Sequence, residues 1–158
     1  QLNNDNNLET VLHNVWPNLL AGRQDKSFWK YQWRTHGLCS SPPVQVTDYF
    51  NAAATVHATL IAKTPNKNLI DYFVAAGINP DGHTFYSLHA ITAAVRTMVG
   101  SNNHVYVSCK SNGTHNLLHE VYLCLDQQLH NFIPCPLRTG QKGCGSYPRR
   151  KNIILPTF

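Results

Sequence analysis

The stretch FWKYQWRTHGLC (residues 28–39) combines two tryptophans, a histidine and a cysteine within a short segment. Trp29 and Trp33 lie one helical turn apart, so the stretch predicts a helix that its tryptophans anchor to the core and that Gly37 ends. On such a helix the polar side chains share one arc of about 140° at 100° per residue: Tyr31, Gln32, Thr35 and His36. From the spacing alone, this is either an active-site helix or an aromatic core helix with an ordinary buried histidine.

Helical periodicity continues on both sides of this stretch. Upstream, apolar residues recur at helical spacing over residues 8–19, which predicts an amphipathic helix that Pro17 ends or kinks. Downstream, further helices are predicted over residues 47–61, 69–76 and 88–99. Thr47 or Asp48 is the expected cap of the first of these helices, and Ser87 is the expected cap of the last.

The pattern changes to a strand-like one after residue 104. Residues 105–109 alternate apolar with polar side chains, residues 117–125 are β-branched and apolar enough for a central strand, and residues 129–133 predict a short third strand. Helices first and strands afterwards predict the α+β class with an antiparallel sheet. A length of 158 residues suits one globular domain, so we expect a single domain over residues 1–158.

The composition points to a basic, secreted type of protein. With 13 Lys+Arg against 8 Asp+Glu the formal net charge is +5, which favours polyanionic partners such as RNA. No apolar run approaches the roughly 18 residues of a spanning helix, so we expect no membrane contact. Five cysteines without a CxxC pair suit disulfides better than a metal site. The N-G-T sequon at Asn112 agrees with a secretory route and glycosylation.

Histidine spacing offers one candidate metal pair, His115 and His119 at i and i+4. Asn112 and Gly113 lie just upstream, and a strand is predicted to follow, so this segment is not expected to be helical. Histidines four residues apart suit a shared metal when a helix presents them on one face. We therefore expect neither a metal nor another cofactor.

The twelve-residue stretch resembles the second active-site segment of the ribonuclease T2 family, F-W-x-H-E-W-x-K-H-G-T-C. The matching positions are Phe28, Trp29, Trp33, His36, Gly37 and Cys39. Upstream LxxxWPNLL, and downstream GINPDGHTFYSLHAITAAV, VYLC, NFIPCP and ILPTF, resemble a plant member of the family in order and spacing. The resemblance therefore covers nearly the whole chain, and it implies a ribonuclease T2-like α+β fold with helices packed on the sheet. Tyr31, Gln32 and the basic character resemble the self-incompatibility ribonucleases.

The resemblance implies a reaction on single-stranded RNA. The family makes the 2′-hydroxyl attack the adjacent phosphorus, giving a 2′,3′-cyclic phosphate, and this requires two proton-transfer groups with positive charge nearby. His36 matches one of these groups. Tyr31, Gln32 and Thr35 stand where the family has a phosphate-binding histidine, a carboxylate and a lysine, so the site is degenerate.

The family's first active-site segment, F-T-I-H-G-L-W-P, supplies the second histidine and does not occur in these 158 residues. The resemblance places it upstream of Gln1, together with about two N-terminal strands that are then missing from the sheet. It also leaves Cys39 for a disulfide-linked N-terminal fragment. Cysteine counting alone allows three pairings of the other four cysteines, whereas the family pairs Cys109 with Cys144 and Cys124 with Cys135.

The resemblance further implies a base-binding pocket at Asn18, Leu20 and Phe28, in which Phe28 stacks on the base and Asn18 reads its edge. Two functions follow from these observations. The first is a secreted or vacuolar plant ribonuclease that binds single-stranded RNA weakly, with little or no activity as this chain alone. The second is a catalytically degenerate storage, defence or binding protein that keeps the fold.

Overall fold

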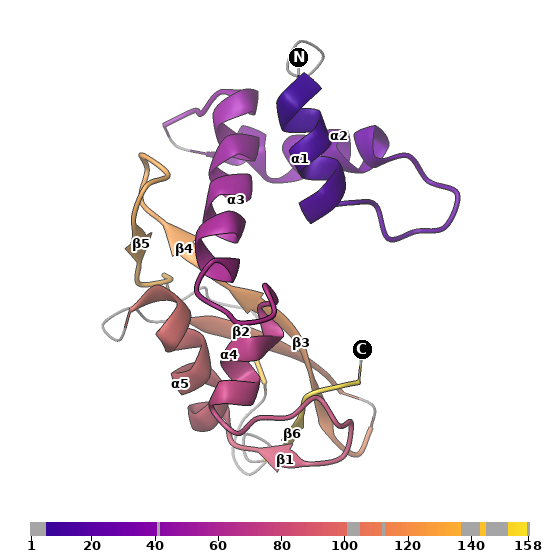
Figure 1. The fold of residues 1–158 in the computed structure, drawn as a ribbon, viewed down its shortest axis with the longest axis vertical. Helices are drawn as coiled ribbons and strands as arrows, with labels where there is room; N and C mark the ends of the chain where they lie inside the picture. The colour runs from indigo at the N-terminus through magenta and orange to yellow at the C-terminus, as the bar shows by residue number, and fades with distance from the viewer. Residues whose placement is uncertain are drawn as a thin grey trace. The chain divides into compact units, whose positions relative to one another are not determined.

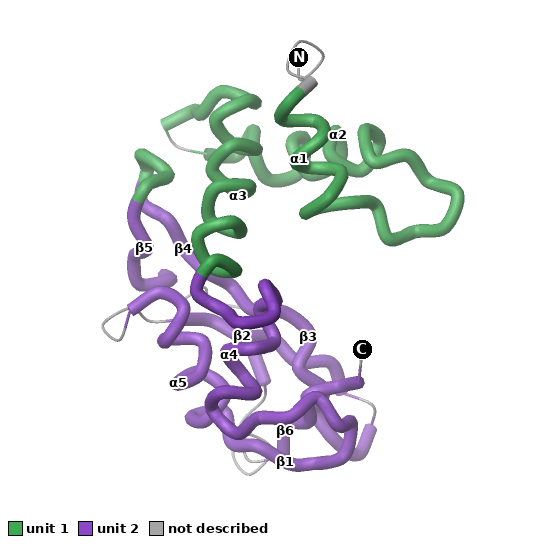
Figure 2. The backbone as a smooth tube through the Cα atoms, viewed as in Figure 1, with its two compact units in different colours: residues 1–62, 127–130 green, residues 63–126, 131–158 purple. Residues whose placement is uncertain are grey.

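The computed structural model describes residues 6–40, 42–100, 105–111, 113–136, 143–144 and 152–157. The chain forms two compact units (Figures 1 and 2): unit 1 comprises residues 1–62 with 127–130, and unit 2 comprises residues 63–126 with 131–158. The single-domain expectation stays a prediction. Asn112, the glycosylation candidate, lies outside the described residues. None of the described helices is long and apolar enough to cross a membrane.

The regular secondary structure in the described part of unit 1 is all helical. It consists of α1 (Asn6–Val15), α2 (Asp25–Thr35), the 3-10 helix η2 (Gly37–Cys39) and α3 (Val46–Ile61). The helix predicted from the apolar spacing ends at Val15, so the expectation that Pro17 ends it is confirmed. Pro17 lacks an amide hydrogen and favours an extended residue before it. Leu19 is consequently 90% exposed. The predicted cap of α3 is wrong, since the helix begins at Val46 after Gln45, which makes no side-chain cap.

The core of unit 1 is built around aromatic rings. Its buried members come from three helices: Leu8, Leu12, Trp29 and Phe50. Half-buried side chains pack around them: Trp16, Phe28, Trp33, Val46 and Tyr49. The ring of Trp16 lies 5.9 Å from that of Phe50, and Tyr49 meets Phe50 edge to face at 5.0 Å. Since burial of large rings dominates core energetics, α2 is fixed in unit 1 mainly through its tryptophans.

Unit 2 contains the remaining helices, α4 (Ile70–Ala75) and α5 (Leu88–Val99). The Ser87 cap is confirmed, because its hydroxyl accepts a hydrogen bond of 3.1 Å from the amide of Ala90. The apolar stripe of α5 faces the core, with Ile91 and Val95 fully buried. The helix ends before Gly100, whose φ of +94° is a conformation that favours glycine.

A four-stranded sheet and a two-stranded ribbon complete unit 2. The larger sheet has the order β1-β6-β3-β2 and the ribbon pairs β4 with β5. The strands are β1 (Phe85–Tyr86), β2 (Tyr106–Ser111), β3 (Asn116–Tyr122), β4 (Cys124–Leu125), β5 (Phe132–Ile133) and β6 (Ile153–Ile154). The α+β class is confirmed. The sheet is mixed rather than purely antiparallel, because β6 pairs parallel with β3 on one side and antiparallel with β1 on the other.

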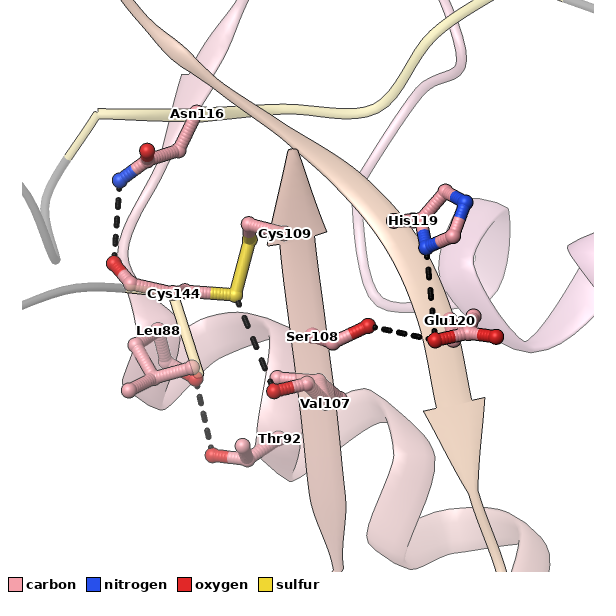
Figure 3. Close-up of a disulfide and its surroundings, with 9 residues drawn as sticks. All are labelled: Leu88, Thr92, Val107, Ser108, Cys109, Asn116, His119, Glu120 and Cys144. Atoms are coloured by element: carbon pink, nitrogen blue, oxygen red, sulfur yellow. Dashed lines mark hydrogen bonds and ion pairs between the residues drawn. A yellow bond between two sulfur atoms is a disulfide. The ribbon is translucent and has the colours of Figure 1, made fainter. Parts of the chain in front are cut away.

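Two disulfides hold unit 2 together, and they are the pairs that the family resemblance implies. Cys109 is bonded to Cys144, and Cys124 to Cys135. Figure 3 shows the first pair beside β2, where the buried amide of Asn116 also donates to the Cys144 carbonyl at 3.0 Å. The covalent bond and this hydrogen bond together hold residues 143–144 against the sheet.

Candidate functional site

Helix α2 presents the motif with its tryptophans inward. Trp29 is buried, and its indole Nε1 donates a hydrogen bond of 2.9 Å to the carbonyl of Trp16. Trp33 is half-buried and meets the ring of Tyr49 edge to face at 5.6 Å. The predicted anchoring by the two tryptophans is therefore confirmed, and the opposite side of α2 is left for polar side chains.

Gly37 allows the chain to turn sharply at the end of α2. A Cβ atom at this position would lie 2.1 Å from Cε3 of Trp33, so only glycine lets the backbone pass against the indole ring. The turn is held further by the Ser40 hydroxyl, which donates to the Gly37 carbonyl at 2.9 Å and accepts from the Val44 amide at 3.1 Å. The packing of Trp33 thus determines where the preceding residue, His36, is placed.

His36 sits between α2 and η2 and is exposed. Its amide donates to the Gln32 carbonyl at 2.9 Å, its carbonyl accepts from the Cys39 amide at 3.3 Å, and its φ of −122° lies outside the helical range. Within the described part of the chain, the imidazole makes no hydrogen bond or ion pair. Cys39 carries a free, exposed thiol three residues further on.

The remaining residues of the predicted arc lie on α2 itself. Tyr31 is 60% exposed, Thr35 is exposed and Gln32 is half-buried. The helix therefore brings this arc to the surface beside His36. The arc offers hydroxyl and amide groups together with the imidazole, but Thr35 brings no positive charge to it.

The predicted base-binding residues lie in and beside the loop that joins α1 to α2. The side chain of Asn18 is part of this loop, because its Nδ2 donates to the Gln24 carbonyl at 3.3 Å and its Oδ1 accepts from the Leu20 amide at 3.1 Å. An amide has two N–H groups and two lone pairs, so one of each remains for a ligand. Leu20 is 68% exposed. Phe28 is half-buried, with its ring edge to face with Trp16 at 6.0 Å.

A histidine–carboxylate pair that no local pattern predicted lies next to this loop. His13 of α1 is hydrogen bonded through Nδ1 to Asp25, the first residue of α2. The other carboxylate oxygen of Asp25 accepts from the Asn18 amide at 2.7 Å. The Asn18 amide and, after it, His13 hold the pKa of Asp25 below its ordinary value of 3.8. The partners are 12 residues apart on two helices, so no local sequence pattern marks them.

The histidines considered as a metal pair lie in unit 2. His119 belongs to β3 and its Nδ1 is 3.4 Å from Glu120 Oε2. Figure 3 marks this contact with a dashed line. His115 directly precedes β3 and its ring contacts that of Phe85 at 4.9 Å. The segment is not helical, as expected. Among the described residues no three His, Cys, Asp or Glu side chains form a group that could hold a metal ion.

Comparison with known proteins gives a consistent result. Residues 1–135 match the model of the Ribonuclease T2 family. Ribonuclease 1 of Arabidopsis thaliana is 34% identical over 153 residues, which are 96% of this chain and 60% of that protein. The crystal structure of RNase NT in complex with 5′-AMP matches with a TM-score of 0.76 and 27% identity, over 100% of this chain and 71% of that one. Japanese pear S3-RNase matches with a TM-score of 0.70 and 27% identity, over 92% and 70%.

Proposed function

The chain belongs to the ribonuclease T2 family and is of the plant type, and we propose that it binds single-stranded RNA on the exposed side of α2 but cleaves it negligibly by itself. This proposal rests on one observation: His36 and Thr35 are both exposed and lie next to each other at the end of α2. The chain spans about 60% of the length of its Arabidopsis relative, and any activity of a longer protein is part of the proposal.

The expected lack of cleavage follows from what the reaction needs. One group must take the proton of the attacking 2′-hydroxyl while another protonates the leaving oxygen on the opposite side of the phosphorus. His36 serves one of these roles. Thr35 supplies no positive charge for the crowded phosphorus, and the loss of such a contact typically costs about 2 to 4 kcal/mol of transition-state stabilisation.

Binding requires less than cleavage, and the residues for it are present. Phe28, Tyr31 and Thr35 follow one another at i, i+3 and i+7, so they share one side of α2. A base that stacks on the exposed part of Phe28 gains about 1 to 3 kcal/mol. The spare N–H and lone pair of Asn18 can meet a base edge. A 5′-AMP complex is known for RNase NT, and we propose a comparable nucleotide here.

We further propose that the Cys39 thiol is the attachment point of an additional segment that carries the second proton-transfer group. Cys39 is exposed and free, and it lies three residues after His36, at the end of η2. The two disulfides of unit 2 agree with an oxidising compartment, as expected for a secreted or vacuolar protein with a glycan at Asn112. The alternative, a catalytically degenerate binding protein, rests on the departures at Tyr31, Gln32 and Thr35.

Binding of 5′-AMP and of a short single-stranded RNA, measured by calorimetric titration, tests this proposal. Phe28→Leu should weaken both, whereas Phe85→Leu, which alters an exposed ring in unit 2, should leave both unchanged. RNA affinity should fall about tenfold between 50 and 200 mM salt, as expected for roughly two phosphate contacts. Affinity that is insensitive both to salt and to Phe28→Leu would contradict the proposal.

A further inference from the structure

The loop between α1 and α2 is attached to α2 at two points. Asp25 accepts the Asn18 amide at 2.7 Å, and Trp29 donates from its indole to the Trp16 carbonyl at 2.9 Å. Asp25 and Trp29 are one helical turn apart and therefore lie on the same side of α2. The backbone of the loop is thus held at residues 16 and 18, on either side of Pro17.

Asp25 is itself held from α1. Its second carboxylate oxygen is hydrogen bonded to Nδ1 of His13, and a neighbouring ion pair joins Lys26 to Glu9 at 2.9 Å. These four side chains line one open cavity of about 560 Å³, together with Thr10, Gln24 and Trp29. The Asp25 side chain is only 17% exposed, and both of its oxygens are hydrogen bonded.

From these contacts, and on the basis of the nucleotide-binding function proposed above, we propose that Asp25 is the positioning residue of the base-binding loop. It fixes the backbone of Asn18 through the Asn18 N–H, and the backbone in turn places the Asn18 side chain. That side chain accepts a hydrogen bond from the backbone amide of Leu20. Asp25 does not contact the base. α2 also carries Phe28 and is followed by His36. This one helix therefore fixes the position of the base-binding loop relative to the proton-transfer group.

A carboxylate suits this role because it can accept two hydrogen bonds at once, one on each oxygen. Asp25→Asn keeps one acceptor oxygen for the Asn18 amide, whereas Asp25→Ala removes both acceptors and leaves that amide without its partner. The asparagine variant should therefore retain most of the positioning. His13→Gln should have the smaller effect, since it leaves the contact between Asp25 and Asn18 in place.

The test compares Asp25→Ala, Asp25→Asn and wild type in titrations with 5′-AMP, 5′-GMP and inorganic phosphate. In Asp25→Ala we expect about a tenfold loss of affinity for the preferred nucleotide, as for a lost hydrogen bond to a charged group, and an AMP-to-GMP affinity ratio closer to one. Phosphate affinity should stay unchanged, and Asp25→Asn should recover most of the loss. Asp48→Ala, which removes a carboxylate from the first turn of α3, is the matched control.

A second readout keeps this inference separate from the proposed function. The Asn18 amide should be protected from hydrogen exchange in wild type and Asp25→Asn, and it should lose that protection in Asp25→Ala. If wild type binds no nucleotide, the proposed function fails and this exchange measurement alone decides the positioning role. Unchanged Asn18 protection in Asp25→Ala, or nucleotide selectivity equal to that of wild type, would overturn the inference.

Discussion

The two units of the chain are stabilised by different means. Unit 2 has two disulfides, a four-stranded sheet and aliphatic side chains such as Ile91 and Ile153 that are fully buried. Unit 1 is built on aromatic packing around α2 and on hydrogen bonds from side chains to backbone. Its one cysteine, Cys39, is free.

The unit that the disulfides stabilise is not the unit that carries the proposed nucleotide site. Every residue of the proposed nucleotide site, from Asn18 to His36, belongs to unit 1. Regions with exposed backbone hydrogen bonds and few buried contacts open most readily, and the loop that Asp25 holds is such a region. Unit 2 therefore acts as the covalently braced part of the chain, whereas unit 1 carries the surface on which a ligand is expected to bind.

The largest expected effect is the loss of the disulfide between Cys109 and Cys144. Its sequence separation of 35, against 11 for the other disulfide, predicts a loss of about 4 kcal/mol in the unfolding free energy of the Cys109→Ala/Cys144→Ala variant. The three tryptophans, Trp16, Trp29 and Trp33, all lie in unit 1. The urea midpoint of this variant should therefore fall further when unfolding is followed by circular dichroism than when it is followed by tryptophan fluorescence.

The control for this experiment is Cys39→Ala, which should change neither transition because that thiol is free. Equal shifts of the circular dichroism and fluorescence transitions in the disulfide variant would show that the units unfold together. The claim that the disulfides stabilise unit 2 and not unit 1 would then be wrong.

A smaller effect is expected in unit 1 from Gly37→Ala. The added Cβ would meet the Trp33 ring at 2.1 Å, so the turn after α2 must move, at a cost of about 1 to 3 kcal/mol. Tryptophan fluorescence should report the lower unfolding midpoint. In the Trp33→Leu/Gly37→Ala double variant the indole ring is absent, so the Gly37→Ala substitution should be less costly there than it is alone. Strictly additive losses would contradict a direct clash between the added methyl group and the Trp33 indole.

The smallest effect concerns the pH dependence of unit 2. The carboxylate of Asp81 accepts hydrogen bonds from the Thr84 hydroxyl and from the amides of Thr84 and His83, which lower its pKa from 3.8 to about 2. A depressed pKa in the folded state stabilises the protein above the unfolded pKa, and this contribution disappears as the pH falls through the folded value. Asp81→Asn should therefore lower stability at pH 6, and the difference should vanish toward pH 2.

Urea unfolding of wild type and Asp81→Asn at several pH values, followed by circular dichroism, measures this difference. His83→Ala is the companion variant, because it removes the imidazole and keeps the backbone amide that contacts Asp81. It should leave most of the pH dependence in place. A stability difference for Asp81→Asn that is the same at pH 2 and pH 6 would show that the turn does not depend on the ionised carboxylate.

The sequence predicted the parts of the molecule that rest on local spacing. Trp29 and Trp33 identified the inward side of α2, and Ser87 identified the start of α5, because a turn of helix relates the residues involved. The disulfide pairing came from the family resemblance, since cysteine counting allowed three pairings. Tyr31 proved exposed on the expected side of α2. His36 is exposed too, but it lies just beyond the end of the helix at Thr35 rather than on it, and the roles of both residues remain predictions.

What the sequence did not reveal depends on contacts between distant segments. Strands β1 and β6 have two residues each, too few for a periodic pattern, and they become visible only through pairs such as Phe85 with Ile154. The contact of Asp25 with His13 likewise requires two helices to meet.

The cleavage of single-stranded RNA by the purified chain, shown by intact mass to carry no disulfide-attached fragment, tests the central claim most directly. Between about pH 4 and pH 8, where histidine-based proton transfer operates, we expect rates near background. His36→Ala should leave them unchanged, because the loss of one of two proton-transfer groups already costs roughly 10²- to 10⁴-fold. Release of 2′,3′-cyclic phosphate ends at a rate that His36→Ala abolishes, and that His89→Ala on the exposed side of α5 retains, would contradict the account.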